Sequence, residues 1–284
     1  MNRLAAIIFA ALFLASSAHA QAVDGRLKKI LEAKSIAIAY RADAAPFSFL
    51  DEQKQPTGYS VDLCKEVVRS IEVENRTKLE TRWVPVTIQT RFDAVASGAA
   101  DMECSSSTVT LSRMKQVDFS SLIFIESTGV LVRSASGARS LADLKGKRIA
   151  VVADTTNARA VNDQLLRRGL NASMLPFKTR EEGLAALEAG KADAFASDKL
   201  LLVGAAAKSR EPGMLSMLPE DLSFEPYGIA LPRGDATFRL AVNSALARLY
   251  PSDEMGQIFK RWFGSLGRPS GVLAAVYIFG SIPE

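Results

Sequence analysis

The sequence predicts an α/β protein of two similar lobes, each with a mixed, mostly parallel sheet flanked by helices. Short apolar runs typical of buried strands, such as residues 36–40 and 147–152, alternate with amphipathic helical stretches such as 58–71. The joint Ala-Ser-Gly-Ala-Ala-Asp at residues 96–101 also returns as Glu-Ala-Gly-Lys-Ala-Asp at 188–193. This weak internal duplication indicates two lobes of one design.

The periodicity predicts the order of elements within each half. In the first half, helices are expected at residues 26–34, 58–71 and 90–97, and strands at 36–40, 81–86 and 101–104. The helix at 58–71 is the clearest, because Leu63, Val67 and Ile71 recur on one face. In the second half, strands are expected at 147–152 and 192–195, with one helix ending at residue 168 and another at 181–189.

Polar loops follow the predicted strands. They are residues 41–47, 87–91, 105–108, 154–157 and Asp198, and they are rich in hydroxyl groups, Arg and Asp. Ligands of parallel sheets bind beyond the carboxyl ends of the strands, so facing loops of this kind predict a polar cleft between the lobes. The alternative is ordinary surface loops, which are polar in any case.

The N-terminus has the three parts of a secretory signal peptide. Arg3 precedes an apolar run at residues 4–14, and Ala18-His19-Ala20 forms a cleavage site. A membrane span would need about 20 apolar residues, more than this run offers. We expect residues 1–20 to be removed after Ala20 and the chain to be exported to the periplasm.

The composition of the mature chain excludes much chemistry. Without residues 1–20 it holds 34 Lys and Arg against 31 Asp and Glu, and no histidine. A Ser-His-Asp triad and a histidine metal site are therefore excluded, and Cys64 and Cys104 alone cannot form a thiolate cage. The basic residues are scattered, so nucleic acid is not an expected partner. We expect a binding protein with no catalytic residues, metal or cofactor.

Cys64 and Cys104 suit an oxidising compartment and could form a disulfide. The alternative is two buried free thiols, because sequence alone does not place them within bonding distance.

An ordered set of motifs carries a family resemblance. The motifs are Pro-Phe-Ser-Phe at 46–49, Gly-Tyr-Ser-Val-Asp-Leu at 58–63, Asp-Met-Glu-Cys-Ser at 101–105, Arg113 before Val-Asp-Phe-Ser at 117–120, Leu-Ala-Asp-Leu-Lys-Gly-Lys at 141–147, and Phe-Lys-Arg-Trp-Phe at 259–263. Together they resemble the periplasmic amino-acid-binding proteins of ABC importers, solute-binding protein family 3. Arg41 and the context of Arg91 are most similar to the glutamate/aspartate-binding branch.

The resemblance implies the type II periplasmic binding protein fold, in which the chain crosses twice between lobes. The crossings, expected as hinges, would fall near residues 126–129 and 224–227. The implied divisions are a first lobe of residues 21–127 with 227–265, a second lobe of residues 128–226, and a tail of residues 266–284. The tail is apolar but too short to span a bilayer, so we expect it to pack on the lobes.

The resemblance also implies roles for residues that hold the amino-acid backbone. Arg113, with Thr108 and Thr155, is expected to bind the α-carboxylate, which calls for a guanidinium and hydroxyl or N–H donors. Asp198, assisted by Ser106, is expected to accept from the α-ammonium. The residues alone also permit a surface charge at Arg113 and a helix cap at Asp198.

The side-chain end of the pocket would contain Arg41 and Arg91, which in the acidic branch face the ligand's distal carboxylate. The sequence departs from that branch in two places. Ile88 stands where a hydroxyl residue is expected, and Arg180 stands near the place of a histidine. Phe47 is expected to pack against the ligand.

These expectations favour a monomeric, non-enzymatic protein that binds an acidic amino acid, glutamate or aspartate, and delivers it to an inner-membrane ABC permease. The departures leave room for another dicarboxylic or amide amino acid. One alternative is an enzyme on the same scaffold, such as a cyclohexadienyl dehydratase. Another is a sensor component that presents its ligand-bound form to a receptor.

Overall fold

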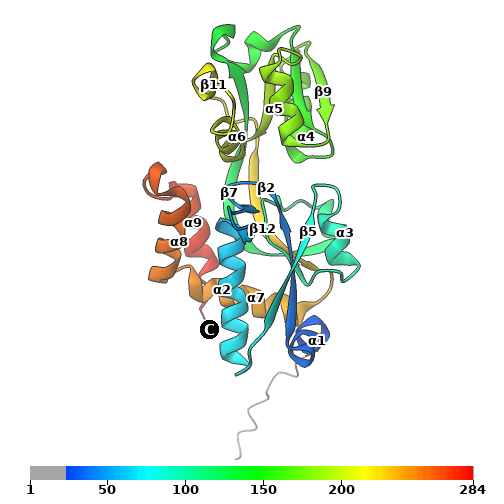
Figure 1. Ribbon diagram of the computed structural model, residues 1–284, viewed down its shortest axis with the longest axis vertical. Coiled ribbons are helices and arrows are strands. Elements are labelled where there is room, and N and C mark those ends of the chain that lie inside the picture. The colour runs from blue at the N-terminus through cyan, green and yellow to red at the C-terminus, as the bar shows by residue number, and fades with distance from the viewer. Residues whose placement is uncertain (1–23, 284) are drawn as a thin grey trace, which may run out of the picture.

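The computed structural model describes residues 24–283. The expected signal peptide, residues 1–20, lies outside the described residues. Two lobes stand one above the other and are joined at a narrow waist (Figure 1). Each lobe is a mixed sheet covered by helices, and the predicted two-lobed α/β architecture is confirmed.

Lobe 1 is built on three parallel strands at one edge of the sheet, since β5 and β6 both pair with β1. Its elements are α1 (Gly25–Ala33), β1 (Ser35–Arg41), β2 (Asp43–Ala44), β3 (Ser48–Leu50), β4 (Pro56–Thr57), α2 (Tyr59–Glu74), β5 (Glu80–Val86), α3 (Arg91–Ala96), β6 (Met102–Glu103), α7 (Ala236–Leu249), α8 (Asp253–Phe263) and α9 (Gly271–Gly280). The short strands β2, β3 and β4 form a separate antiparallel sheet.

Lobe 2 repeats the design with β10, β8 and β9 as parallel neighbours. Its elements are β8 (Arg148–Val152), α4 (Thr156–Arg167), β9 (Ser173–Phe177), α5 (Arg180–Glu188), β10 (Ala194–Asp198), α6 (Lys199–Ala206) and β11 (Leu215–Met217). Strand β11 adds antiparallel to the strand that arrives from lobe 1.

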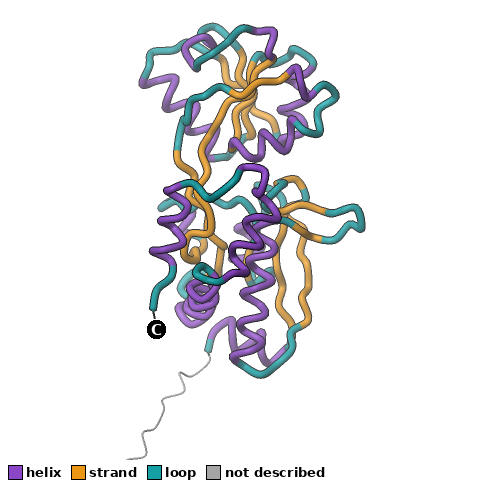
Figure 2. Tube along the Cα trace, turned by 90° about the vertical axis from the view of Figure 1, so that its left-hand side faces the viewer, coloured by secondary structure: helices purple, strands orange, loops and turns teal. Residues whose placement is uncertain are grey.

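Two long strands cross the waist, β7 (Val117–Arg133) and β12 (Phe224–Pro232). They pair antiparallel, with Glu225 opposite Glu126 and Phe224 opposite Ser127. Beyond this point β7 pairs with β10, beginning at Thr128 opposite Asp198. Figure 2 shows strand segments passing through the waist in the side view as well. One continuous path of paired strands therefore runs through both lobes.

The hydrophobic patterns place the five expected helices correctly, but they miss the helices α6, α7, α8 and α9 and several strands. On α2 the predicted apolar face of Leu63, Val67 and Ile71 is fully buried. The small sheet of β2, β3 and β4 lies where the sequence predicts loops, because its two- and three-residue strands are too short to show a period. Strand β9 was not expected either, and its burial pattern shows no alternation.

The C-terminal tail packs on lobe 1, as expected. Leu273 and Tyr277 of α9 are buried, and the hydroxyl of Tyr277 lies 2.7 Å from that of Tyr59. The ring of Tyr277 stacks on Tyr250 at 5.4 Å between centroids. Within residues 24–283, no helix has both the length and the apolarity to cross a membrane.

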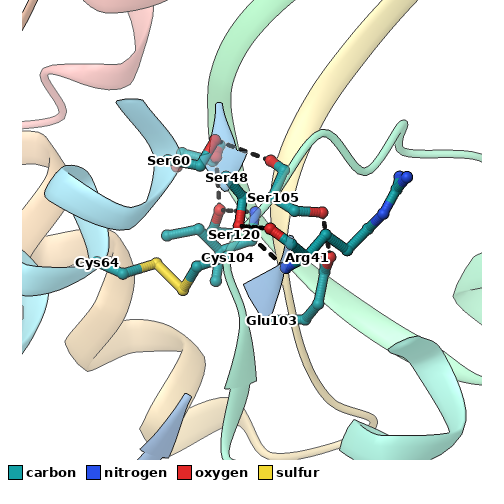
Figure 3. The surroundings of a disulfide bond; sticks show 10 residues. Arg41, Ser48, Ser60, Cys64, Glu103, Cys104, Ser105 and Ser120 are labelled. Carbon is teal, nitrogen blue, oxygen red and sulfur yellow. Dashed lines mark hydrogen bonds between the residues drawn. A yellow bond between two sulfur atoms is a disulfide. The ribbon is translucent and has the colours of Figure 1, made fainter. Parts of the chain in front are cut away.

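Cys64 of α2 and Cys104, which follows β6, form a disulfide with their Cα atoms 6.4 Å apart. Figure 3 shows that the bond lies beside a group of buried serines and Glu103. Close by, Ser60 Oγ donates to the Ser105 carbonyl at 2.8 Å. The disulfide and this hydrogen bond anchor α2 to the loop that leads towards Thr108.

Candidate ligand-binding site

A narrow cavity of about 10 Å³ lies between the two lobes, with a wall from each. Lobe 1 contributes Arg41, Ile88, Arg91, Ser106, Thr108 and Arg113, and lobe 2 contributes Thr155, Thr156, Asn157, Arg180 and Asp198. Every binding residue expected from the sequence except Phe47 is among them.

The expectation for Phe47 is wrong. Its side chain is completely buried in lobe 1 and packs edge-on against Tyr59, Phe124 and Tyr227, with ring centroids 4.9–6.0 Å apart. An aromatic ring enclosed in this way is part of the hydrophobic core and has no surface for a ligand.

The sheet topology explains why residues so far apart in sequence meet here. Arg41 is the last residue of β1, and Asp198 is the last of β10. Thr155 caps α4 after β8, while Arg91 and Arg180 begin α3 and α5. Carboxyl ends of parallel strands and the helix starts that follow them meet at one edge of each sheet, and both edges face the cavity.

Arg41 and Arg180 are tied together by an acidic residue that was not expected at the site. Nε and Nη2 of Arg41 donate to the two carboxylate oxygens of Asp43, at 2.9 and 2.5 Å. Nη1 of Arg180 approaches the same carboxylate at 3.4 Å, and its Nη2 lies 3.7 Å from Asp198. Asp43 therefore joins an arginine of lobe 1 to an arginine of lobe 2.

Arg91 and Arg113 differ from that pair, because neither forms an ion pair with any residue in the described part of the chain. Arg91 donates to Ser107 Oγ at 3.0 Å and to the Ile88 carbonyl, and Arg113 donates to the Thr108 carbonyl at 2.7 Å. Burial lowers the pKa of Arg91 to about 9, with neighbouring arginines adding to the effect and Glu103 opposing it. Burial also lowers the pKa of Arg113.

A carboxylate cluster lies around the end of β10. Asp198 occupies the N-cap position of α6, but its side chain makes no capping hydrogen bond. Glu126 on β7 is buried nearby, and that burial, together with the charge of Asp198, raises its pKa to about 8. This end of the site suits a cation such as an ammonium group.

Glu225 links hydroxyl groups from both lobes. One carboxylate oxygen accepts from Thr108 Oγ1 at 2.7 Å and from Thr156 Oγ1 at 2.6 Å. The other accepts from Ser223 Oγ at 2.6 Å and from Thr128 Oγ1 at 3.2 Å. The buried carboxylate thus accepts four hydrogen bonds from hydroxyl groups at the waist.

Ser106 and Thr155 offer different groups to the cavity. The Ser106 hydroxyl is buried with no hydrogen-bond partner among the described residues, so it is free to bind a ligand. The Thr155 hydroxyl donates to the Val152 carbonyl at 2.8 Å and accepts from the Ala158 N–H at 3.1 Å. What Thr155 presents is therefore the N-terminus of α4, whose first N–H groups favour an anion.

Sequence reasoning missed four residues of this region, namely Asp43, Thr156, Asn157 and Glu225. Asp43 and Thr156 lie inside loops that were expected to face the cleft, and Glu225 lies inside an expected crossing. An acid in a buried crossing segment is itself a signal, since a buried carboxylate needs several donors.

A larger, open cavity lies elsewhere. Its volume is about 960 Å³, and β9, α5 and β11 of lobe 2 border it. Its charged residues carry both signs, with Arg133, Lys178 and Arg210 opposite Glu182 and Glu188. The interlobe cavity is the better candidate because several buried polar groups converge on it.

Comparison with known proteins identifies the family of the chain. The sequence profile of the bacterial extracellular solute-binding proteins, family 3, matches residues 36–265. An L-glutamate/L-aspartate-binding protein of Pseudomonas aeruginosa is 36% identical over 95% of this chain and 89% of its own length. A glutamate/aspartate import solute-binding protein of Escherichia coli strain K12 is 31% identical over 86% and 81%.

A solved structure extends the comparison to the fold. An ancestral amino-acid-binding protein, described as a precursor of cyclohexadienyl dehydratase, superposes with a TM-score of 0.73 at 27% identity. The superposition covers 84% of this chain and all of that one. By its sequence and its two-lobed architecture, the chain belongs to the family 3 bacterial extracellular solute-binding proteins.

Proposed function

We propose that the chain captures an acidic amino acid, glutamate or aspartate, between its two lobes and delivers it to an inner-membrane ABC permease. The carrying observation is a pair of guanidinium groups, that of the buried Arg91 and that of the half-buried Arg113, neither of which has a carboxylate partner within residues 24–283. Both lie over the ring of Phe92, at 4.3 and 5.1 Å from its centroid. A small dicarboxylate would supply the two missing anions.

The other cavity residues complete the proposed arrangement. Arg113 and the start of α4 at Thr155 hold the α-carboxylate, and Asp198 with Ser106 accepts from the α-ammonium. The Thr108 hydroxyl, expected from the sequence to join Arg113, already donates to Glu225. Arg91 takes the distal carboxylate, with the N–H groups of Arg41 that do not bind Asp43. The names of the Pseudomonas and Escherichia relatives support this substrate class.

We also propose that closure occurs at the waist, near residues 126–129 and 224–227. The lobes are then residues 21–127 with 227–265 and residues 128–226, and the mature protein acts as a periplasmic monomer. The pairing of β7 with β12 at Glu126 and Glu225 supports this, because within residues 24–283 these two strands carry the strand pairing from one lobe to the other.

A thermal-shift panel of the protein from Gln21 to Glu284, against the twenty amino acids and prephenate, tests the proposal. A ligand at 100 times its dissociation constant stabilises by about 2.7 kcal/mol, or roughly 5–11 °C in a protein of this size. Stabilisation by glutamate and aspartate is expected. Stabilisation by prephenate alone would contradict the proposal and favour the dehydratase.

One variant and two further assays complete the test. In the thermal-shift panel, Asp198→Asn should abolish the response to every amino acid, because the ammonium group is common to all of them. Uptake of labelled glutamate by cells that lack the chain tests delivery: intact uptake with a lost signalling response would assign the chain to a receptor. Size-exclusion chromatography tests the monomer.

A further inference from the structure

Asp43 occupies the Arg41 edge that would otherwise grip a ligand carboxylate. Bidentate recognition uses two parallel N–H donors of one guanidinium, and Nε and Nη2 of Arg41 already form such a pair with Asp43. Arg41 is almost completely buried and lines the binding cavity. The N–H donors that remain for a ligand are those of Nη1 and the second one of Nη2.

Asp43 also reaches Arg180. Arg180 is buried between Asp43, at 3.4 Å, and Asp198, at 3.7 Å, and its Nε donates to Ser197 Oγ at 3.2 Å. Burial opposes ionisation of Asp43, but Arg41 and Arg180 outweigh it and hold its pKa below the ordinary value. Asp43 is therefore a full negative charge at neutral pH.

Asp43 acts through these arginines and not by touching the ligand. It is absent from the lining of the binding cavity and instead lines a second cavity of about 270 Å³, together with Arg180 and residues of α6. Behind the binding cavity, its charge offsets part of the positive potential that Arg41 and Arg180 create.

Arg91 can bind a neutral acceptor on the ligand as well as an anionic one. Its present partners, Ser107 Oγ and the Ile88 carbonyl, are both neutral acceptors. A ligand carboxamide oxygen is a third acceptor of the same kind, and its NH₂ group is less repelled where Asp43 offsets the arginines.

We propose that Asp43 is a positioning residue that makes the preference of the site for carboxylate over carboxamide side chains smaller. Glutamine and asparagine are therefore ligands as well. This inference rests on the proposed function, since it concerns the same cavity and the same class of ligand. Glutamate remains the better ligand, by less than about tenfold, which corresponds to about 1.4 kcal/mol.

Isothermal titration of the wild type and of Asp43→Asn with glutamate and glutamine tests the proposal. The asparagine variant keeps the shape of the side chain and removes its charge. The ratio of the glutamine to the glutamate dissociation constant should rise at least tenfold, because a lost negative charge favours an anionic ligand over its neutral isostere. A merely structural role of Asp43 would weaken both ligands alike and leave the ratio unchanged.

Two further variants protect the test against misfolding. Asp43→Glu keeps the charge and should keep the wild-type ratio. Asp193→Asn is the matched control, since Asp193 forms a bidentate pair with Arg148 inside lobe 2, does not line the binding cavity, and precedes the end of β10 opposite to Asp198. It should change neither dissociation constant.

The outcomes separate this inference from the proposed function. An unchanged ratio in Asp43→Asn, or a wild type that binds glutamate and ignores glutamine, overturns the inference and leaves the proposed function standing. A wild type that binds none of the four acidic and amide amino acids overturns both.

Discussion

Replacing Arg91 by Met should leave the unliganded protein nearly as stable as the wild type, although the side chain is buried. Removing a buried arginine usually strands its carboxylate partner, and the loss is then about 3–5 kcal/mol. Arg91 has no such partner among the described residues, since its acceptors are Ser107 and the Ile88 carbonyl. The comparison variant is Arg41→Met, which leaves Asp43 with Arg180 alone.

The magnitude follows from the burial of the charge. A pKa lowered from 12.5 to about 9 corresponds to roughly 5 kcal/mol of unfavourable free energy for the charged form of Arg91. Two hydrogen bonds from a charged donor return about 1.5–3 kcal/mol each. These terms nearly cancel, so Arg91→Met should change the free energy of unfolding by about 1 kcal/mol or less. Arg41→Met should lower it by about 3 kcal/mol, the low end of the range, because Arg180 still faces Asp43.

Thermal and urea denaturation of both variants without ligand, followed by the same scans with glutamate, measure the two effects. Arg91→Met should lie within about 4 °C of the wild type and Arg41→Met about 6–12 °C below it. The shift produced by glutamate should be lost in Arg91→Met. If Arg91→Met destabilises the unliganded protein as much as Arg41→Met does, Arg91 is a structural cation and its assignment to the ligand is refuted.

Three other perturbations have equally definite outcomes. Glu126→Gln should stabilise the protein at pH 8 and not at pH 4.5, because burial and Asp198 raise the pKa of Glu126 to about 8. Between the ordinary pKa of 4.5 and a pH of about 8 the folded state keeps a proton that the unfolded state releases, so wild-type stability is intact below pH 4.5 and falls as the pH rises from there to about 8. Equal effects of the substitution at both pH values would contradict this. Reducing the Cys64–Cys104 disulfide opens a 40-residue loop and should cost about 4 kcal/mol, seen as a fall in Tm under dithiothreitol. Gly204→Leu should weaken all amino-acid ligands by a similar factor in calorimetry, because a Cβ at Gly204 of lobe 2 would lie 3.0 Å from the Ala45 carbonyl oxygen of lobe 1; an effect on one ligand only would refute a role in closure.

The lobes and most of the binding residues could be predicted because they follow from local patterns and strand ends. The apolar face of α2 is a 3.6-residue period, and Arg41 and Asp198 each end a strand whose apolar run is visible in the sequence. The parallel topology then brings those strand ends to one edge of each sheet, so the prediction needs no knowledge of contacts between distant residues.

What could not be predicted depends on contacts between distant segments. Phe47 has the position of a ligand contact in its loop, but the direction of its ring is set by Tyr59 and Tyr227, which are far away in the chain. The pairing of the charged side chains around the pocket could not be predicted either. Asp43 is only two residues from Arg41, but its pairing with Arg180 arises across the lobes.

The waist itself connects ligand capture to the lobe geometry. Glu225 lies on a crossing strand and accepts from Thr108 of lobe 1 and from Thr156 of lobe 2. If the lobes separate at the waist, Thr156 must leave this carboxylate, and Glu225 loses one of its hydrogen-bond donors. The charge of Glu225 also opposes the lowering of the Arg113 pKa by burial. A buried carboxylate that lacks a hydrogen-bond donor destabilises the protein, so the four hydroxyl groups around Glu225 favour the closed form.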